Sequence, residues 1–256
     1  MARYSACIEM LFPELPFVER VKAALDCGYD AVEFWQWHTK DIPALAATGA
    51  TFALALVDSA DDAVRAEYGR IGMLRKESPE LFARVLEETI LALKPLNVGL
   101  IVAGPGQAQP DLSREEQEAN IAACLRRAEP VLEKYGAQFA IEPLNPIDHR
   151  GCYLQEAAQA YRIVRDAGAQ RAGVLFDIYH QQVTEGNLIQ RISDGIDLIR
   201  HFHIADVPGR HQPGTGEINY RNVLSAIEKT GYSGYLGCEF IPTCDTRSAS
   251  EYILSL

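Results

Sequence analysis

The chain has 256 residues, of which 48% are hydrophobic and 23% are charged, a balance typical of a folded globular enzyme. Its 35 acidic and 24 basic side chains give a formal net charge of −11. Such a surface repels nucleic-acid phosphates and anionic lipids, so we expect neither nucleic acid nor a membrane as partner. A small anionic substrate is still compatible, because a bound metal ion can override the overall field.

The cysteines indicate a reducing compartment. None of the six belongs to a C-x-x-C pair, which argues against a zinc ribbon or a disulfide scaffold. The first residues lead directly into a strand-like run, and no apolar run reaches the length of a membrane span. We therefore predict free thiols and a cytoplasmic location. The six are Cys7, Cys27, Cys124, Cys152, Cys238 and Cys244.

Eight short apolar runs recur along the chain, bounded by glycine or polar residues. Runs that are apolar on both faces are typical of buried parallel strands. The predicted strands are Tyr4–Glu9, Ala31–Phe34, Thr51–Leu56, Val98–Ala103, Gln138–Glu142, Ala172–Asp177, His201–Ala205 and Tyr235–Glu239.

Amphipathic segments alternate with these strands. The segment that begins at Ser113 opens with a capping-box pattern, Ser113-Arg114-Glu115-Glu116, and several segments stop before a glycine, as helices commonly do. The predicted helices are Pro16–Cys27, Pro79–Leu96, Ser113–Tyr135, Leu154–Ala167, Tyr220–Lys229 and Ser248–Leu256.

Alternation of strand and helix through eight units predicts an α/β fold with a parallel sheet. We expect residues 1–256 to form one (β/α)8 TIM barrel, since no edge strand or reversal of strand order is visible. A doubly wound open sheet is the alternative, but its phosphate-binding fingerprint is missing. The run Gly104-Pro105-Gly106 has the wrong spacing for it, and we interpret this run as a loop.

Polar residues end four successive late strands. Glu142, Asp177 and Glu239 each close an apolar run, and His203 follows Arg200-His201-Phe202. In a barrel these positions share the C-terminal mouth, where such enzymes carry their active sites. A single acid at a strand end is often a helix cap, and a single histidine is often a core residue. Four such residues in register are harder to explain in that way.

Three carboxylates beside an imidazole require a cation to offset their mutual repulsion in a partly dry pocket. Oxygen ligands with a single nitrogen suit Mg²⁺ or Mn²⁺, with Co²⁺ or Zn²⁺ as alternatives. The sequence therefore predicts one divalent metal ion held by Glu142, Asp177, His203 and Glu239.

Other side chains are predicted to surround this group. His180 could donate to a substrate oxygen or cap the helix that follows, and Arg210 could pair with a substrate carboxylate or be a solvated loop charge. Glu33, Trp35 and Trp37 come from the second-strand region. The two tryptophans either wall the substrate pocket, with Trp35 as a substrate contact, or simply cover the barrel mouth.

Four motifs resemble the hydroxypyruvate isomerase family of the xylose-isomerase-like barrel superfamily. They are Ile141-Glu142-Pro143-Leu144-Asn145, Phe176-Asp177-Ile178-Tyr179-His180-Gln181, the stretch from His203 to Arg210, and Pro213-Gly214-Thr215-Gly216-Glu217-Ile218-Asn219-Tyr220. The resemblance is strongest between residues 138 and 241.

The resemblance implies roles for these residues. Glu142, Asp177, His203 and Glu239 would be metal ligands, Glu142 and Glu239 would also be the catalytic acid–base pair, and His180 and Arg210 would contact the substrate. The implied reaction is isomerisation of a small hydroxy-carbonyl compound by enediolate proton transfer, hydroxypyruvate to tartronate semialdehyde first of all.

The sequence leaves other functions open. The same residues could perform 3-epimerisation of a ketose or dehydration of a polyol-type substrate. A non-catalytic sugar-binding barrel would not require both glutamates. A DNA-repair endonuclease on this scaffold needs a histidine-rich multi-metal cluster, and the chain has six histidines in all. Whether the chain forms a homo-oligomer is also left open.

Overall fold

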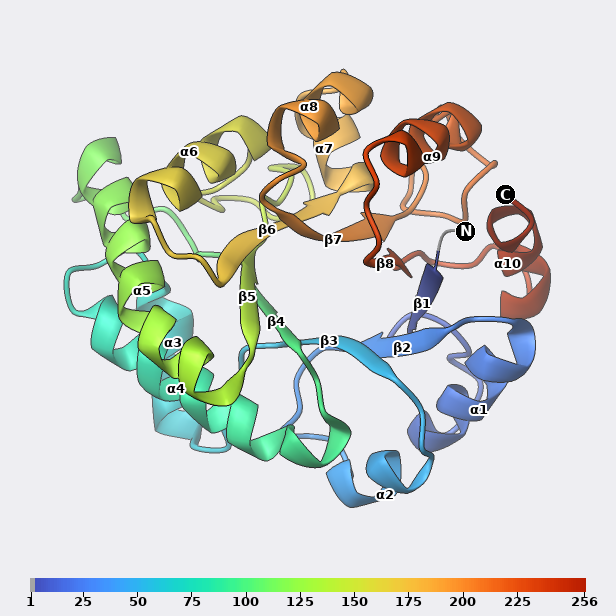
Figure 1. Ribbon diagram of the computed structural model, residues 1–256, viewed down its shortest axis with the longest axis horizontal. Helices are drawn as coiled ribbons and strands as arrows, with labels where there is room; N and C mark the ends of the chain where they lie inside the picture. Colours follow the sequence, from blue (N-terminus) through green and yellow to red (C-terminus); the bar gives the residue numbers. More distant parts are fainter. Residues whose placement is uncertain (1–2) are drawn as a thin grey trace.

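The computed structural model describes residues 3–256, whose eight parallel strands close into a barrel surrounded by helices (Figure 1). Each strand pairs with its neighbours in sequence, and β1 pairs with both β2 and β8, which closes the ring. This confirms the predicted TIM barrel and excludes the open sheet. The strands are β1 Arg3–Cys7, β2 Ala31–Phe34, β3 Phe52–Leu56, β4 Leu100–Ala103, β5 Gln138–Ile141, β6 Ala172–Asp177, β7 Ile199–Ile204 and β8 Tyr235–Cys238.

The predicted helices are present with small shifts of their ends. The capping box at Ser113 is formed, with both its side-chain and its backbone hydrogen bonds. The predicted Pro79–Leu96 is interrupted, since α4 ends at Ala92 and a separate 3₁₀ turn, η1, spans Lys94–Leu96. The observed counterparts are α1 Phe17–Cys27, α4 Ser78–Ala92, α5 Arg114–Tyr135, α6 Ala157–Ala167, α9 Tyr220–Lys229 and α10 Thr246–Leu254.

Four further helices were not predicted: α2 Ile42–Ala47, α3 Asp62–Ile71, α7 Ile178–Thr184 and α8 Leu188–Gly195. Three of them have eight residues or fewer, too short for a periodic apolar stripe to stand out. The longer α3 buries only Ile71, and its start is set by the Asp61 side chain, which accepts from two backbone amides.

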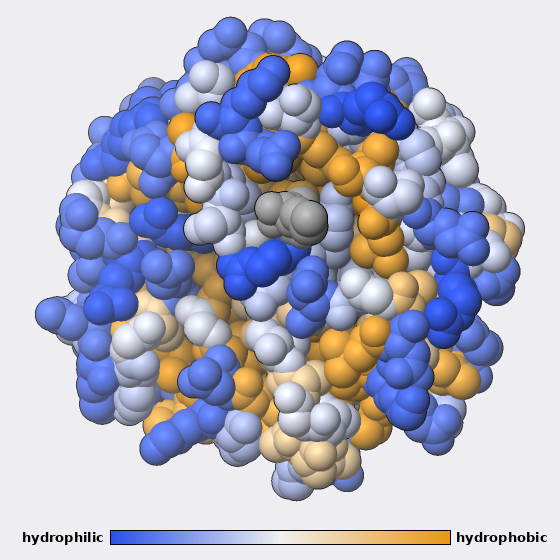
Figure 2. Space-filling view, turned by 45° about the vertical axis from the view of Figure 1, so that its right-hand side comes forward, coloured by the Kyte–Doolittle hydropathy of each residue, from blue (hydrophilic) through white to orange (hydrophobic). Residues whose placement is uncertain are grey.

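The surface agrees with the acidic composition. Figure 2 shows one face on which hydrophilic side chains predominate and hydrophobic surface is divided into separate patches. Among residues 3–256, no helix combines the length and the apolar character needed to cross a membrane.

Candidate metal centre and active site

The four predicted metal-ligating side chains converge at the C-terminal ends of β5 to β8. Glu142 follows β5, Asp177 ends β6, His203 lies near the end of β7 and Glu239 follows β8. One ligand-type atom from each lies within 4.8 Å of those from the other three, and all four residues are buried. The closest contact joins Nδ1 of His203 to Oε2 of Glu239 at 3.0 Å. The group can therefore hold a single metal ion.

The two carboxylate oxygens of Asp177 have different partners, one in helix α7 and one in the metal cluster. Oδ1 caps α7 by accepting from the amides of Tyr179 at 2.8 Å and His180 at 3.2 Å. Oδ2 faces the site, where it accepts from Nη2 of Arg210 at 2.8 Å. The residue is thus both the helix cap and a member of the cluster, although a cap was considered the competing explanation for such an acid.

The donor set fits a divalent cation. Nδ1 of His203 lies 3.0 Å from Glu239, 3.7 Å from Glu142 and 4.0 Å from Asp177. Neither Nδ1 nor Nε2 of this ring makes a hydrogen bond of normal geometry within the described chain. A buried nitrogen without a partner, aimed at three carboxylates, is the arrangement in which a metal ion satisfies all four groups. Three oxygen ligands with one imidazole nitrogen suit Mg²⁺, Mn²⁺ and related ions.

The two glutamates lie in electrostatically different surroundings. Burial raises the pKa of Glu142, and the nearby charges of Glu239 and Asp177 add to this, against the opposing effect of His203. Burial also opposes ionisation of Glu239, but the charges of His203 and Arg210 outweigh it and hold the pKa of Glu239 well below its usual range. Carboxyl pairs whose environments push their pKa values apart are suited to opposite acid–base duties.

Arg210 lies at the edge of the four-residue cluster. Its Nη2 contacts both Asp177 and Glu239, and its Nη1 lies 2.9 Å from Nε2 of His180. The side chain is 14% exposed, so Arg210 is not the solvated loop charge considered as an alternative.

His180 is oriented by Asn145. Oδ1 of Asn145 accepts from the amides of Ile147 at 3.0 Å and Asp148 at 2.9 Å, which fixes the amide so that Nδ2 points at Nδ1 of His180, 2.6 Å away. Nδ1 therefore accepts, and the single proton of the neutral ring lies on Nε2. Burial lowers the pKa of His180, which favours that neutral form. His180 thus presents an N–H donor to the site.

The two tryptophans after β2 behave differently. The indole Nε1 of Trp35 donates to Oε1 of Glu239 at 2.7 Å, so Trp35 orients one of the predicted acid–base glutamates. Nε1 of Trp37 instead points to the backbone oxygen of Asp58 at 3.2 Å, which anchors the loop after β3. Only Trp35 reaches the cluster.

The loop that carries Arg210 is built around a buried aspartate. Asp206 accepts from four backbone amides, those of Val207 at 2.9 Å, Gly214 at 2.8 Å, Gly216 at 3.0 Å and Ile218 at 3.1 Å. A Cβ at Gly216 would collide with the backbone oxygen of Val207 and with Asp206 itself. The Pro-Gly-Thr-Gly motif therefore forms part of the loop whose backbone amides surround this carboxylate.

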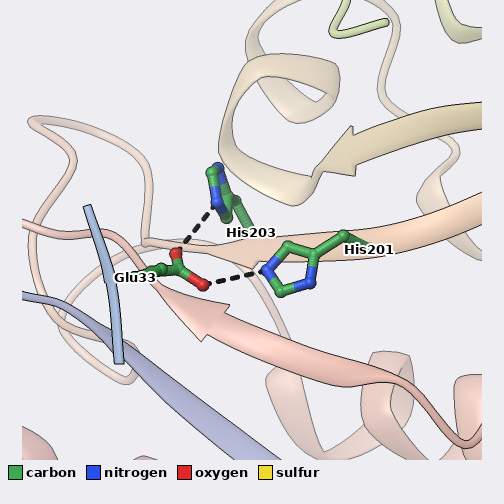
Figure 3. Close-up of side chains that lie close together, drawn as sticks. All are labelled: Glu33, His201 and His203. Atoms are coloured by element: carbon green, nitrogen blue, oxygen red, sulfur yellow. Dashed lines mark ion pairs between the residues drawn. The ribbon is translucent and has the colours of Figure 1, made fainter. Parts of the chain in front are cut away.

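A second cluster lies directly behind His203. Glu33 lies within β2, whose bounds match the predicted strand Ala31–Phe34, and it is 1% exposed. Its carboxylate contacts His203 and His201 and accepts from Ser5 (Figure 3). Burial opposes ionisation of Glu33, but the two imidazoles outweigh it and lower its pKa to about 2. The alternation His201-Phe202-His203, which puts both rings on one face of β7, was the signal available in the sequence.

Comparison with known proteins agrees with this geometry. Residues 21–256 match the model of the xylose isomerase-like TIM barrel family. The chain is 33% identical to hydroxypyruvate isomerase of Escherichia coli over 257 residues, covering 99% of this chain and 98% of that protein. It is 29% identical to 2-oxo-tetronate isomerase of Haemophilus influenzae, covering 98% of each.

A similar solved structure is a protein of Brucella melitensis described as an AP endonuclease of family 2. It is 27% identical, with a TM-score of 0.91, and the match covers 100% of this chain and 99% of that one. The family model matches most of the chain, and the curated relatives over its full length are named isomerases. The chain therefore belongs to the xylose isomerase-like TIM barrel family and is an enzyme of the isomerase class.

Proposed function

We propose that the enzyme isomerises a small 2-oxo acid with a hydroxyl on the carbon next to the carbonyl, with hydroxypyruvate as the first candidate. The observation that carries this proposal is the convergence of Glu142, Asp177, His203 and Glu239 beside the guanidinium of Arg210. The relatives named above are called isomerases of hydroxypyruvate and of 2-oxo-tetronate, and both names describe 2-oxo acids.

The four clustered residues would hold one Mg²⁺ or Mn²⁺ ion, with Co²⁺ or Zn²⁺ as alternatives. Such an ion supplies Lewis acidity, which acidifies the C–H beside a carbonyl. Glu142 and Glu239 directly follow β5 and β8, which are separated in the barrel by β6 and β7. One glutamate removes the proton from the hydroxyl-bearing carbon, and the other returns a proton to the former carbonyl carbon, while the hydroxyl proton passes to the former carbonyl oxygen.

The surrounding donors favour a carboxylate substrate. Nε2–H of His180 and Nη1–H of Arg210 are both donors, and their nitrogens lie only 2.9 Å apart. Two donors this close repel each other. An oxygen of a substrate carboxylate that accepts from both would remove that repulsion. A neutral ketose offers weaker hydroxyl acceptors at the same position.

Endonuclease activity, suggested by the description of the Brucella structure, is poorly supported. The four-residue cluster contains a single histidine, and the formal net charge is −11. A surface of that charge repels DNA phosphates and reduces the rate of encounter.

The test is proton NMR in D₂O of the enzyme loaded with Mn²⁺ or Mg²⁺, given hydroxypyruvate, a 2-oxo-tetronate and a panel of ketoses in parallel. We expect solvent deuterium to enter hydroxypyruvate as tartronate semialdehyde forms. Exchange only at C3 of a ketose would reassign the enzyme to 3-epimerisation, and loss of a hydroxyl from a polyol-type substrate would reassign it to dehydration. Loss of turnover after chelation, with recovery on adding back metal, is expected in each case.

Substitution Arg210→Lys tests recognition of the carboxylate. Lysine keeps the charge, but its single ammonium cannot contact Asp177 and Glu239 and also donate to a substrate oxygen, as the two Nη groups of arginine can. We expect kcat/KM for hydroxypyruvate to fall on the order of 10- to 100-fold, the equivalent of one charge-assisted hydrogen bond. Steady-state kinetics on the metal-saturated variant measure this loss.

The matched control is Arg126→Lys, an exposed arginine on α5, which should leave kcat/KM unchanged. An equal fall in kcat/KM for hydroxypyruvate and for any ketose that turns over would show that Arg210 does not read the carboxylate.

A further inference from the structure

Glu33 is a buried acid in the barrel interior, one shell behind the candidate metal site. Its Oε1 lies 3.0 Å from Nε2 of His203, and its Oε2 lies 3.1 Å from Nε2 of His201. Figure 3 shows the carboxylate between the two imidazoles, with a different oxygen directed at each. Ser5 donates to Oε2 at 2.7 Å. Three elements, β1, β2 and β7, thus meet at one carboxylate.

The backbone of β8 leaves room for this contact. A Cβ placed on Gly237 would lie 2.5 Å from Oε1 of Glu33 and 2.6 Å from Nε2 of His201. A side chain at 237 would have to displace the carboxylate or the imidazole, so the glycine leaves the space that Glu33 and His201 occupy.

The two nitrogens of His203 face opposite partners. Nε2 lies 3.0 Å from Oε1 of Glu33, and Nδ1 faces the cluster of Glu142, Asp177 and Glu239. Within residues 3–256 neither nitrogen, nor Oε1 of Glu33, makes a hydrogen bond of normal geometry, so a hydrogen bond between Nε2 and Oε1 belongs to the proposal. A neutral imidazole carries one proton, so a carboxylate that accepts at Nε2 leaves Nδ1 with a free lone pair. A carboxylate behind a metal-ligating histidine fixes its tautomer and ring orientation and increases its basicity.

We propose that Glu33 is a positioning residue that accepts the Nε2 proton of His203 and so presents the unprotonated Nδ1 to the metal ion. His201 and Ser5 hold the carboxylate in place through its other oxygen. The inference rests on the proposed function, because it assigns Nδ1 of His203 as a metal-ligating atom. Glu33 would thus act on the metal site through His203, without being a metal ligand itself.

The tautomer of His203 can be observed directly in the unaltered protein, with one variant used only to assign signals. Long-range ¹H–¹⁵N correlation spectra of the histidine-labelled protein, loaded with Zn²⁺ as a diamagnetic ion, distinguish a protonated ring nitrogen from an unprotonated or metal-bound one. We expect His203 to show a protonated Nε2 and a metal-bound Nδ1, with the signals of His201 assigned from a His201→Gln variant. A His203 ring protonated at Nδ1 would overturn the proposal.

The affinity for Mn²⁺, followed by EPR titration, gives a second readout that does not depend on turnover. Glutamine at position 33 keeps the volume of Glu33 but has one acceptor oxygen for two histidines. We expect Glu33→Gln to weaken Mn²⁺ binding by about 10- to 100-fold, the usual effect of losing such a partner. His201→Gln leaves the contact between Glu33 and His203 intact and should weaken binding far less.

The outcomes separate this inference from the proposed function. If Glu33→Gln and His201→Gln weaken Mn²⁺ binding equally, or if neither does, Glu33 does not position His203. If the unchanged enzyme binds no Mn²⁺, the proposed metal site is wrong, and the spectra of the metal-free protein still report whether Nε2 of His203 is protonated. Two Mn²⁺ ions per chain, one of them lost in His201→Gln, would show that Glu33 is a metal ligand instead.

Discussion

Replacing Glu239 by glutamine is expected to lower kcat for hydroxypyruvate by on the order of 10² or more, the usual contribution of a positioned acid or base. Glutamine has nearly the same shape and keeps one oxygen toward the cluster, but it cannot exchange a proton with the substrate carbon. Trp35 donates to Oε1 of Glu239 and Arg210 donates to Oε2, so the amide keeps an acceptor for only one of these two donors. Turnover and solvent deuterium exchange, both at saturating Mn²⁺, measure the effect.

Saturation with metal separates the two duties proposed for Glu239, because weaker Mn²⁺ binding is then compensated and only the loss of proton transfer remains. The control is Glu217→Gln, an exposed glutamate in the motif after β7, which should leave kcat unchanged. An unchanged kcat in Glu239→Gln would remove Glu239 from the acid–base pair and leave it, at most, a metal ligand.

The barrel was predictable because its eight strands are short apolar runs separated by amphipathic segments. All eight predicted strands overlap the observed ones, and the ends differ by a few residues where pairing stops. The helices α2, α7 and α8 were missed because each has eight residues or fewer. In so short a segment apolar periodicity carries little information, and tertiary contacts outweigh local propensity.

The candidate site was predictable for those residues that lie at the carboxyl ends of strands. Glu142, Asp177, His203 and Glu239 could be placed together because the carboxyl ends of parallel strands meet at one face. The residues behind them could not be placed in this way. Glu33 lies inside a strand, and only the packing of β1, β2 and β7 reveals what its charge contacts. Likewise, the four amides that converge on Asp206 come from a loop whose path no periodic pattern describes.

Asp206→Ala is expected to be the most destabilising single substitution considered in this protein. The aspartate is fully buried and accepts from four backbone amides of the loop after β7. Alanine would leave those N–H groups without their acceptor; the contact with Ile218 is buried, and the other three are partly buried. A buried donor left unsatisfied costs about 1–3 kcal/mol and a partly solvated one costs less, so we expect a loss of about 3 kcal/mol in the free energy of unfolding. Urea denaturation at 25 °C measures it.

The comparison variant is Asp61→Ala. Asp61 also accepts from two backbone amides, at the start of α3, but it is exposed, and water can replace it there. We expect this exposed cap to cost about 1 kcal/mol. Because the Asp206 loop also carries Arg210, the folded fraction of Asp206→Ala should show a fall in kcat/KM for hydroxypyruvate like that of Arg210→Lys. Equal destabilisation by the two alanine variants would mean that the Asp206 loop finds other partners for its amides, and that the Pro-Gly-Thr-Gly motif holds its shape without the carboxylate.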